Sequence, residues 1–545
     1  IHPRDRVAIL SENRLEWALA DLGCLCARVV DVPIYPSLEA AQVAYILRDC
    51  AARLVFVSTP AQMAKVVEAR TQSELDFAIV VFDPPETLPE GVLGWDRFVG
   101  AGAGRAAATP VEAFLSRAAE PTHDDVAMIL YTSGTTGEPK GVMLTHGNVS
   151  SNVLAVGMVL SLTPDDVTVS FLPLCHIFQR TVDYFFLAHG CTVVHGRAIH
   201  TAVDDMVLVQ PTVVGAVPRL CEKMYHSMIQ ARGFRKSLMS WAMSVAERSV
   251  EHRLDGKKPG GLLGLQYQMA DRLVFSKIRK AVGGRVRWFI IGSAPLSPKL
   301  NRFFYSVGLT ILEGYGLTET SPVLNLNTPE HLRIGTVGKA LPGTEIRLAE
   351  DGEILVRGPQ VMKGYYNRPE ETAQAIDEEG WFRTGDIGEV DADGFLRITD
   401  RKKDLLKTSG GKYVAPAVIE NRLKQCPWVE QSVMVGDGRK FVSLLVVPSF
   451  NSLESWARDQ RVEWTRHADL SGNPRVRKHV ESEVRKQFHG LASYETPKKI
   501  VLLAEEFTVA NGFLTPSLKV KRRVVHDHYK ELIDGLYEGL GGAPD

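Results

Sequence analysis

The apolar positions of the first 400 residues fall into short runs separated by longer amphipathic stretches. The runs with strand character are RLVFVS (53–58), FAIVVF (77–82), VAMIL (126–130), VTVSFLPL (167–174), TVVGAV (212–217) and VRWFIIG (286–292). Helical patterns lie between them, and this alternation is typical of a parallel sheet whose strands are connected by helices. The sequence therefore predicts an α/β fold for this part of the chain.

The pattern changes twice towards the C-terminus. From about residue 334, short alternating strands flank the turn pairs Asp351-Gly352 and Asp393-Gly394, which predicts hairpins. After Arg401 the expected elements are a helix over 414–426, strands at 429–436 and 441–448, and a long polar helical stretch over 451–495. We therefore expect two domains, 1–400 and 401–545, and because residue 1 already opens on a strand pattern, we expect further residues upstream.

Composition narrows the class of protein. A chain of 545 residues exceeds the size of one hydrophobic core, so substrate has room between domains. The 63 basic and 64 acidic residues nearly cancel, which gives no electrostatic reason for nucleic acid or an anionic membrane as the main partner. Seven cysteines are too few for a disulfide framework, and no apolar run reaches the roughly 18 residues of a membrane span. We expect a cytoplasmic protein without a transmembrane segment, with peripheral membrane contact left open.

The strongest local signal is YTSGTTGEPKG at 131–141, directly after the strand VAMIL. Its glycines permit tight turns that point N–H groups at an anion, its hydroxyls donate hydrogen bonds, and Lys140 adds a positive charge. The candidate phosphate-binding residues are Thr132, Ser133, Gly134, Thr135, Thr136 and Gly137. The glycine spacing is not that of a Walker A loop. A polar surface turn of the same composition is the alternative.

The loop resembles the nucleotide loop of the adenylate-forming superfamily, which contains acyl-CoA synthetases, nonribosomal-peptide adenylation domains and firefly luciferase. Further elements follow in that family's order: GSAPL (292–296), EGYGLTET (313–320), WFRTGD (381–386), DRKKDLLKTSGGKYVAP (400–416) and NGFLTPSLKVKR (511–522). The resemblance implies a large N-terminal domain of layered α/β sheets with a small β-barrel-like subdomain, followed by a smaller mobile α+β domain. It also implies that the protein uses ATP and Mg²⁺ as cofactors and coenzyme A as a co-substrate.

The resemblance assigns the nucleotide site of the first domain. EGYGLTET would place Tyr315 against the purine, Thr318 near the α-phosphate and Glu319 on Mg²⁺ as a hard oxygen ligand. Glu313, Gly314 and Gly316 complete that element. Gly292, Ser293 and Ala294 follow a strand, where ligands bind in open α/β sheets, and would border adenine and the acyl pocket. An ordinary strand-to-helix turn explains the latter three equally well.

The resemblance also assigns residues near the domain boundary. Asp386 would accept hydrogen bonds from the ribose hydroxyls, and Arg401 would contact ribose or phosphate. Lys403 would be the position about which the smaller domain rotates, and Lys407 would lie on the face presented during thiol transfer. Without the resemblance, Asp386 is interpreted as a turn residue, and the three consecutive basic residues 401–403 are interpreted as a solvated run.

Two further residues complete the expected chemistry. Lys519 matches the mobile lysine that meets the substrate carboxylate and the α-phosphate, although a basic exposed tail is the alternative. The family more often has Ser-Gly-Lys there, whereas this chain has Ser517-Leu518-Lys519, which resembles the long-chain acyl-CoA synthetase branch. His176 in FLPLCHIF matches a gate or orienting group near the thiol entrance, and an isolated histidine beside apolar residues is otherwise a core residue.

The sequence therefore predicts ATP-dependent activation of a long-chain fatty acid through acyl-AMP, followed by transfer to coenzyme A with release of AMP and pyrophosphate. Loading of an acyl group onto a carrier protein and activation of aryl or medium-chain acids are the alternatives within the family. A luciferase-like oxygenase and a non-catalytic fatty-acid binding or transport protein are the others. Lys140, Glu319, Asp386 and Lys519 are all present, which favours catalysis.

Overall fold

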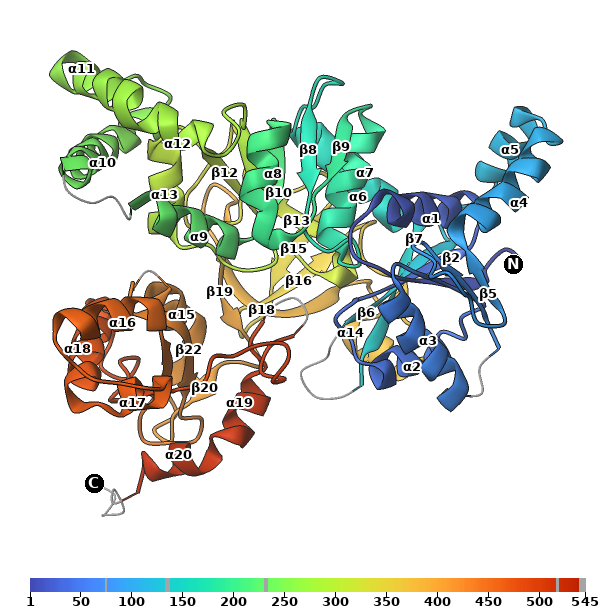
Figure 1. Ribbon diagram of the computed structural model, residues 1–545. Coiled ribbons are helices and arrows are strands. Elements are labelled where there is room, and N and C mark those ends of the chain that lie inside the picture. The colour runs from blue at the N-terminus through green and yellow to red at the C-terminus, as the bar shows by residue number, and fades with distance from the viewer. Residues whose placement is uncertain (74–75, 133–137, 230–233, 425, 516–518, 539–545) are drawn as a thin grey trace. The chain divides into compact units, whose positions relative to one another are not determined.

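The computed structural model describes residues 1–73, 76–132, 138–229, 234–424, 426–515 and 519–538 (Figure 1). Its contacts divide the chain into two compact units. Unit 1 comprises Ile1–Arg347, Leu355–Thr384 and Val390–Leu396, and unit 2 comprises Leu348–Ile354, Gly385–Glu389 and Arg397–Asp545. Each unit has its own hydrophobic core.

An eight-stranded sheet forms the first layer of unit 1. Its order is β17 (Gly364–Tyr365), β7 (Lys140–Thr145), β6 (Val126–Thr132), β2 (Val30–Ile34), β1 (Arg6–Leu10), β3 (Leu54–Val57), β4 (Ala78–Val81) and β5 (Val92–Gly94). The strands from β6 to β5 pair in parallel, and β7 and β17 add antiparallel edges. Central strands such as Val7–Leu10 are buried on both faces, as the continuous apolar runs require.

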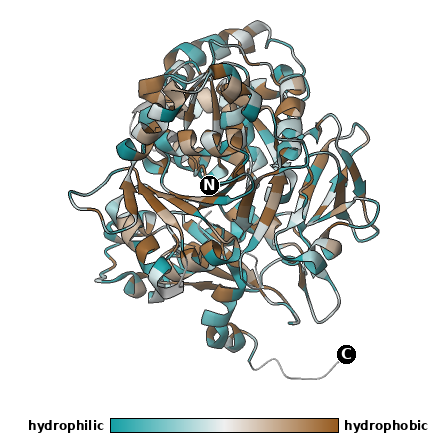
Figure 2. Ribbon diagram, turned by 90° about the vertical axis from the view of Figure 1, so that its right-hand side faces the viewer, coloured by the Kyte–Doolittle hydropathy of each residue, from teal (hydrophilic) through white to brown (hydrophobic). Residues whose placement is uncertain are grey.

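A second sheet carries most of the remaining core of unit 1. Its order is β10 (Val213–Ala216), β11 (Trp288–Ile291), β12 (Thr310–Gly316), β13 (Val323–Leu326) and β14 (Lys339–Ala340). The first three strands are parallel and the last two antiparallel. A separate parallel pair joins β8 (Val167–Ser170) to β9 (Thr192–His195). Figure 2 colours the chain by hydropathy, and many of its strands carry brown, apolar stretches.

Helices connect and cover these sheets. Those of unit 1 are α1 (Leu15–Cys26), α2 (Ala40–Asp49), α3 (Pro60–Ser73), α4 (Trp95–Ala107), α5 (Val111–Ala118), α6 (His146–Val159), α7 (Ile177–Ala188), α8 (Ala202–Val209), α9 (Pro218–Ile229), α10 (Phe234–Leu254), α11 (Gly261–Ala270), α12 (Ser276–Lys280), α13 (Pro298–Ser306) and α14 (Pro369–Ala375). A π-helical turn at Asp271–Phe275 joins α11 to α12, and 3-10 turns lie at Ile199–Thr201 and Thr318–Thr320. The predicted α/β fold and all six quoted strand runs are confirmed.

Short strands occupy the region where hairpins and a small barrel-like subdomain are expected. They form a four-stranded sheet in the order β15 (Glu345–Leu348), β16 (Glu353–Arg357), β18 (Phe382–Val390) and β19 (Leu396–Arg401). Gly352 and Gly394 have φ of 81° and 84°, the left-handed conformation that favours glycine at such turns. The two predicted turn pairs are therefore confirmed.

Unit 2 contains a mixed sheet with helices. The sheet has the order β22 (Val429–Val435), β23 (Ser443–Pro448) and β24 (Lys499–Leu502), and a two-stranded ribbon joins β20 (Leu406–Lys407) to β21 (Tyr413–Val414). The helices are α15 (Pro416–Leu423), α16 (Phe450–Asp459), α17 (His467–Gly472), α18 (Pro474–Arg485), α19 (Arg522–His528) and α20 (Lys530–Gly535), with a 3-10 turn at Lys486–Phe488.

The helical stretch expected over 451–495 is interrupted. Arg461 has a φ of 52° directly after α16, and Pro474 starts a new helix whose first turn is capped by the Asn473 side chain. A left-handed residue and a proline both stop a helix, so three helices replace one. The polar pattern predicted helix correctly but not its division.

Candidate functional site

The predicted phosphate loop connects β6 to β7. Thr132 and Lys140 are opposite one another at the end of this antiparallel pair that the loop connects. Ser133, Gly134, Thr135, Thr136 and Gly137 lie outside the described residues. What the structure places is therefore the two ends of the loop, with Lys140 at the start of β7.

Lys140 and Glu319 are brought together by a residue that the sequence analysis missed. The Lys140 ammonium pairs with the Glu371 carboxylate and lies 5.3 Å from the centroid of the Tyr365 ring. The Tyr365 hydroxyl donates a hydrogen bond to Glu319 Oε1 at 3.0 Å. Burial raises the pKa of Tyr365 well above its ordinary value, so the phenol stays a neutral donor. A positive and a negative group thus converge on Tyr365.

Strand pairing explains this convergence. Tyr365 lies on β17, which pairs with β7 so that Tyr365 is opposite Val142. Met362, just before β17, donates its backbone N–H to the Glu319 carbonyl oxygen at 2.8 Å. The short edge strand therefore fixes the 3-10 turn of Glu319 beside the end of the loop. An edge strand of two residues has no sequence period, so only the GYYNRPEE segment itself could have signalled it.

The turn that carries Thr318 and Glu319 is held by its own side chains. The Thr320 hydroxyl accepts a hydrogen bond from the Leu317 N–H at 3.0 Å and donates to the Pro322 carbonyl oxygen at 2.7 Å. Thr320 is fully buried, whereas Thr318 and Glu319 are partly exposed. The buried threonine thus presents its two neighbours at the surface of the site.

Gly316 has no room for a side chain. A methyl group added there would lie 1.6 Å from the Pro322 carbonyl oxygen, which belongs to the backbone. We expect Gly316→Ala to push this turn out of place, to lower the free energy of unfolding by about 1–3 kcal/mol and to weaken nucleotide binding. Urea denaturation and nucleotide titration measure the two effects. Gly385→Ala, at a position with open space, gives a backbone control, since only its φ of 70° disfavours alanine.

Glu313 differs from its neighbours in the same motif. Its side chain is buried and accepts a hydrogen bond from Asn301 Nδ2 at 2.7 Å, on helix α13. Burial raises its pKa to about 7, against the opposing effect of that hydrogen bond. The carboxyl therefore serves the packing of α13 on β12, while Tyr315 and Gly314 lie on the same strand.

Gly292, Ser293 and Ala294 lie directly after β11, as predicted for a ligand-binding edge. Ser293 has a φ of 69°, which gives the chain a sharp turn before α13. A methyl group on Gly292 would lie 3.5 Å from the Phe178 ring, so this turn packs against the first turn of α7. The structure thus brings this segment beside the helix that follows His176.

His176 caps the N-terminus of α7. Its Nδ1 accepts a hydrogen bond from the Phe178 N–H at 3.2 Å. A ring nitrogen that accepts carries no proton, so the neutral ring holds its proton on Nε2. The capping role fixes the orientation of the ring relative to Gly292.

Helix α7 is anchored by a buried charged group. Arg180 is fully buried and pairs with Asp21 of α1 and Asp31 of β2. Its Nε also donates to the Tyr184 hydroxyl at 2.8 Å, and that hydroxyl donates to Asp21 at 2.7 Å. Burial raises the pKa of Asp31 to about 7, whereas the two carboxylates raise that of Arg180 despite its burial. One arginine thus ties the His176 helix to the eight-stranded sheet.

The remaining predicted residues lie in unit 2. Arg401 Nε donates to Asp386 Oδ1 at 3.0 Å, so these two predicted ribose contacts are neighbours. Lys403 is exposed, and Lys407 lies 5.4 Å from the centroid of the Tyr413 ring. Lys519 is exposed, and its N–H donates to Thr515 Oγ1 at 3.0 Å. The roles assigned to these side chains stay predictions.

The other chemical features of the described residues add little. No three or more His, Cys, Asp or Glu side chains in the described ranges are arranged to hold a metal ion. Magnesium that is held largely by substrate phosphates needs only one or two carboxylates, and Glu319 offers one.

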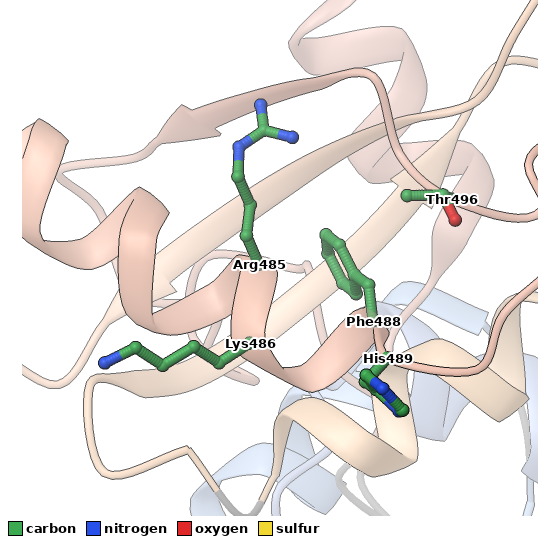
Figure 3. Close-up of a pocket in the computed structure, with 5 residues that line it drawn as sticks. All are labelled: Arg485, Lys486, Phe488, His489 and Thr496. Atoms are coloured by element: carbon green, nitrogen blue, oxygen red, sulfur yellow. The ribbon is translucent and has the colours of Figure 1, made fainter.

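A pocket of about 460 Å³ in unit 2 is lined by Arg485, Lys486, Phe488, His489 and Thr496 (Figure 3). No predicted site residue lies in it. None of the helices in the part of the chain that the structure describes has the length and hydropathy to cross a membrane.

Sequence families cover nearly the whole chain. Residues 1–366 match the family described as AMP-binding enzyme, and residues 403–541 match the AMP-binding enzyme C-terminal domain. The long-chain-fatty-acid–CoA ligase FadD15 of Mycobacterium tuberculosis is 36% identical over 540 residues, which cover 98% of this chain and 88% of that protein. The human long-chain-fatty-acid–CoA ligase 1 is 33% identical over 565 residues, covering 99% and 79%.

Solved structures share the fold. The A domain of carboxylic acid reductase from Segniliparus rugosus, in complex with AMP and a co-purified carboxylic acid, superposes with a TM-score of 0.73 at 23% identity, covering 99% of this chain and 84% of that one. The anthranilate CoA ligase AuaEII, in complex with anthranoyl-AMP, gives a TM-score of 0.72 at 20% identity over 98% and 89%.

Proposed function

This chain belongs to the AMP-binding enzyme family, and from that premise we propose that it activates a long-chain fatty acid with ATP and transfers the acyl group to coenzyme A. Acid and ATP give acyl-AMP and pyrophosphate, and a thiolate then attacks the activated carbonyl and releases AMP. Two easier steps replace one difficult step. Relatives at 33–36% identity that carry the name of this activity support the long-chain acid and the coenzyme A acceptor.

The observation that carries the proposal is the convergence of Lys140 and Glu319 on Tyr365. A polyphosphate needs a cation and a metal ligand within the span of one triphosphate. Lys140 lies over the ring of Tyr365, and Glu319 accepts a hydrogen bond from the hydroxyl of the same residue. Lys140 would bind phosphate oxygens in place of the Glu371 carboxylate. Magnesium, when bound, neutralises charge on the triphosphate and orients it, and Glu319 would hold it.

Unit 2 supplies the groups proposed to change between the two half-reactions. We propose that residues 401–545 turn about Lys403, so that Lys519 serves adenylation and the Lys407 face serves thiol transfer. Asp386 and Arg401 would hold the ribose. The support is the family match of residues 403–541 and the exposure of all three lysines.

The acceptor, the acid class and the location follow from the same proposal. Coenzyme A is preferred to a carrier protein, and a long-chain acid is preferred to an aryl or medium-chain acid. We propose a cytoplasmic enzyme that contacts a membrane surface, where a long acyl chain is most concentrated.

A panel of acids tests the substrate and the acceptor together. We expect AMP release to require coenzyme A and kcat/KM to rise with acyl chain length before it levels off. Benzoate and short acids should give the lowest values. Acid-dependent pyrophosphate exchange without any coenzyme A consumption, or highest activity on an aryl acid, would contradict the proposal.

Tyr365→Phe tests the phenol that links Lys140 and Glu319. Loss of its hydrogen bond removes the contact that orients the Glu319 carboxylate, and the net value of such a bond is about 1 kcal/mol, or roughly fivefold in a binding constant. We therefore expect a roughly fivefold higher magnesium concentration at half-maximal rate. Tyr366→Phe removes the neighbouring hydroxyl and is the matched control. Equal shifts in both variants would exclude a specific role for Tyr365.

A further inference from the structure

Helix α11 has apolar residues on two sides. Leu263, Tyr267 and Ala270 pack into the core of unit 1. Four other side chains point outward and form what we call the outer stripe, with exposed fractions of 72%, 61%, 57% and 41%: Leu262, Leu265, Met269 and Leu273. Their spacing of three, four and four residues places them along one side of α11 and the π-helical turn that follows.

Such a stripe indicates an interaction surface. Single exposed apolar residues are common on proteins, but contiguous apolar surface marks a site where a partner or a membrane binds. A helix with apolar residues on two sides needs cover on both, and the packing of α11 against α10 and the core leaves the outer stripe exposed. Figure 1 shows α11 at the outer edge of unit 1, next to α10.

The charges around the stripe identify the kind of partner. Residues 255–280 contain six basic and two acidic residues, although the whole chain has a net charge of −1. Lys257 and Lys258 are exposed just before α11, and Lys277 and Lys280 are exposed just after the π-helical turn. Asp271, one of the two acids, is paired with Arg279 at 2.7 Å. The near balance of the whole sequence therefore conceals a local positive excess.

An apolar stripe with basic residues at both ends matches an anionic lipid surface. Apolar side chains of an interfacial helix enter the boundary below the headgroups, and nearby lysines bind lipid phosphates. A second copy of the chain is a poorer partner, because a symmetric contact would bring the same positive charges together. Helix α6 offers a contrast: Leu154 and Met158 are as exposed and share the i, i+4 spacing, but its sequence HGNVSSNVLAVGMV has no lysine or arginine.

We propose that the outer stripe docks this enzyme on anionic membranes. Leu262, Leu265, Met269 and Leu273 insert at the headgroup boundary, and the lysines at both ends hold phosphate groups. The purpose of docking rests on the proposed function, since a long-chain acid partitions into bilayers. Docking itself requires no catalysis, so the two can be tested apart.

Vesicle flotation with the full chain tests the surface. We expect binding to phosphatidylcholine vesicles that contain phosphatidylglycerol, little binding to pure phosphatidylcholine, and loss of binding at high salt. Leu265→Ser/Met269→Ser should lower binding at least tenfold, and Lys257→Glu/Lys258→Glu should lower it on anionic vesicles by a similar factor. The matched control Leu154→Ser/Met158→Ser should bind as the wild type does. Because all these side chains are exposed, the variants should fold, and circular dichroism verifies this.

The outcomes separate docking from catalysis. Activity on a water-soluble medium-chain acid without vesicles should be the same in wild type and the α11 variants. If wild type does not float, if the α6 control loses as much binding as the α11 variant, or if the α11 change alters oligomeric state instead of flotation, the proposal is wrong. Flotation without any thioester formation would leave docking intact and contradict the proposed function.

Discussion

Lys519→Ala is expected to abolish acid-dependent ATP–pyrophosphate exchange while thioester formation from supplied acyl-AMP continues. Adenylation builds negative charge on the α-phosphate, and one positioned cation there is worth roughly 10²–10³ in rate. Attack of a thiol on acyl-AMP does not need that cation. The exchange rate and the thioester rate, measured on the same preparation, give the ratio that tests this division.

The local structure makes Lys519→Ala a clean substitution. Lys519 contributes only main-chain groups to two hydrogen bonds with Thr515, because the Thr515 N–H donates to the Lys519 carbonyl oxygen at 2.8 Å and the Lys519 N–H donates to the Thr515 side-chain hydroxyl. Alanine keeps both bonds. Lys521→Ala removes the same charge two residues away and should retain most of the exchange activity. Equal loss of both half-reactions, or equal loss in the Lys521 variant, would leave Lys519 as one member of a basic tail.

Local patterns predicted the parts of this fold that depend on local physics. A strand buried on both faces must be apolar throughout, so VAMIL and VRWFIIG could be read as β6 and β11 without knowledge of their partners. Gly292 to Ala294 could be placed at a strand end for the same reason. The division of the 451–495 stretch at Arg461 and Pro474 was missed, since polar helix patterns continue across a break when both sides remain amphipathic.

Local sequence patterns could not predict contacts between residues that are far apart in the sequence. Tyr365 reaches Glu319 across 46 positions through an edge strand of two residues. Arg180 reaches Asp21 across 159 positions, inside what reads as an ordinary amphipathic helix. Neither pairing has a periodic signal, and the motif resemblance assigned roles to Lys140 and Glu319 without naming the groups that hold them. Which residues carry the chemistry stays a prediction, whereas the residues that position them came from the structure alone.

Arg180→Met is expected to lower the free energy of unfolding by about 3–5 kcal/mol, because it leaves Asp21 and Asp31 buried without their cation. Methionine fills a similar volume, so lost charge pairing and not a cavity dominates. Since α7 also begins at His176, kcat should fall in the fraction that stays folded. Arg397→Met is the matched control: Arg397 and its partner Glu389 are 57% and 61% exposed, and exposed pairs contribute at most about 1 kcal/mol.

The pH dependence of the Arg180→Met variant separates charge from packing. In the wild type, burial raises the folded-state pKa of Asp31 to about 7 although Arg180 lowers it, so removing Arg180 should raise that pKa further. Above pH about 7 the folded variant then binds more protons than the folded wild type, so its stability falls more steeply than that of the wild type as pH rises. Urea denaturation should therefore show a smaller deficit near pH about 5 than near pH about 8.5. A deficit that is independent of pH would mean that Arg180 acts through the packing of its side chain against Trp17 and Tyr184.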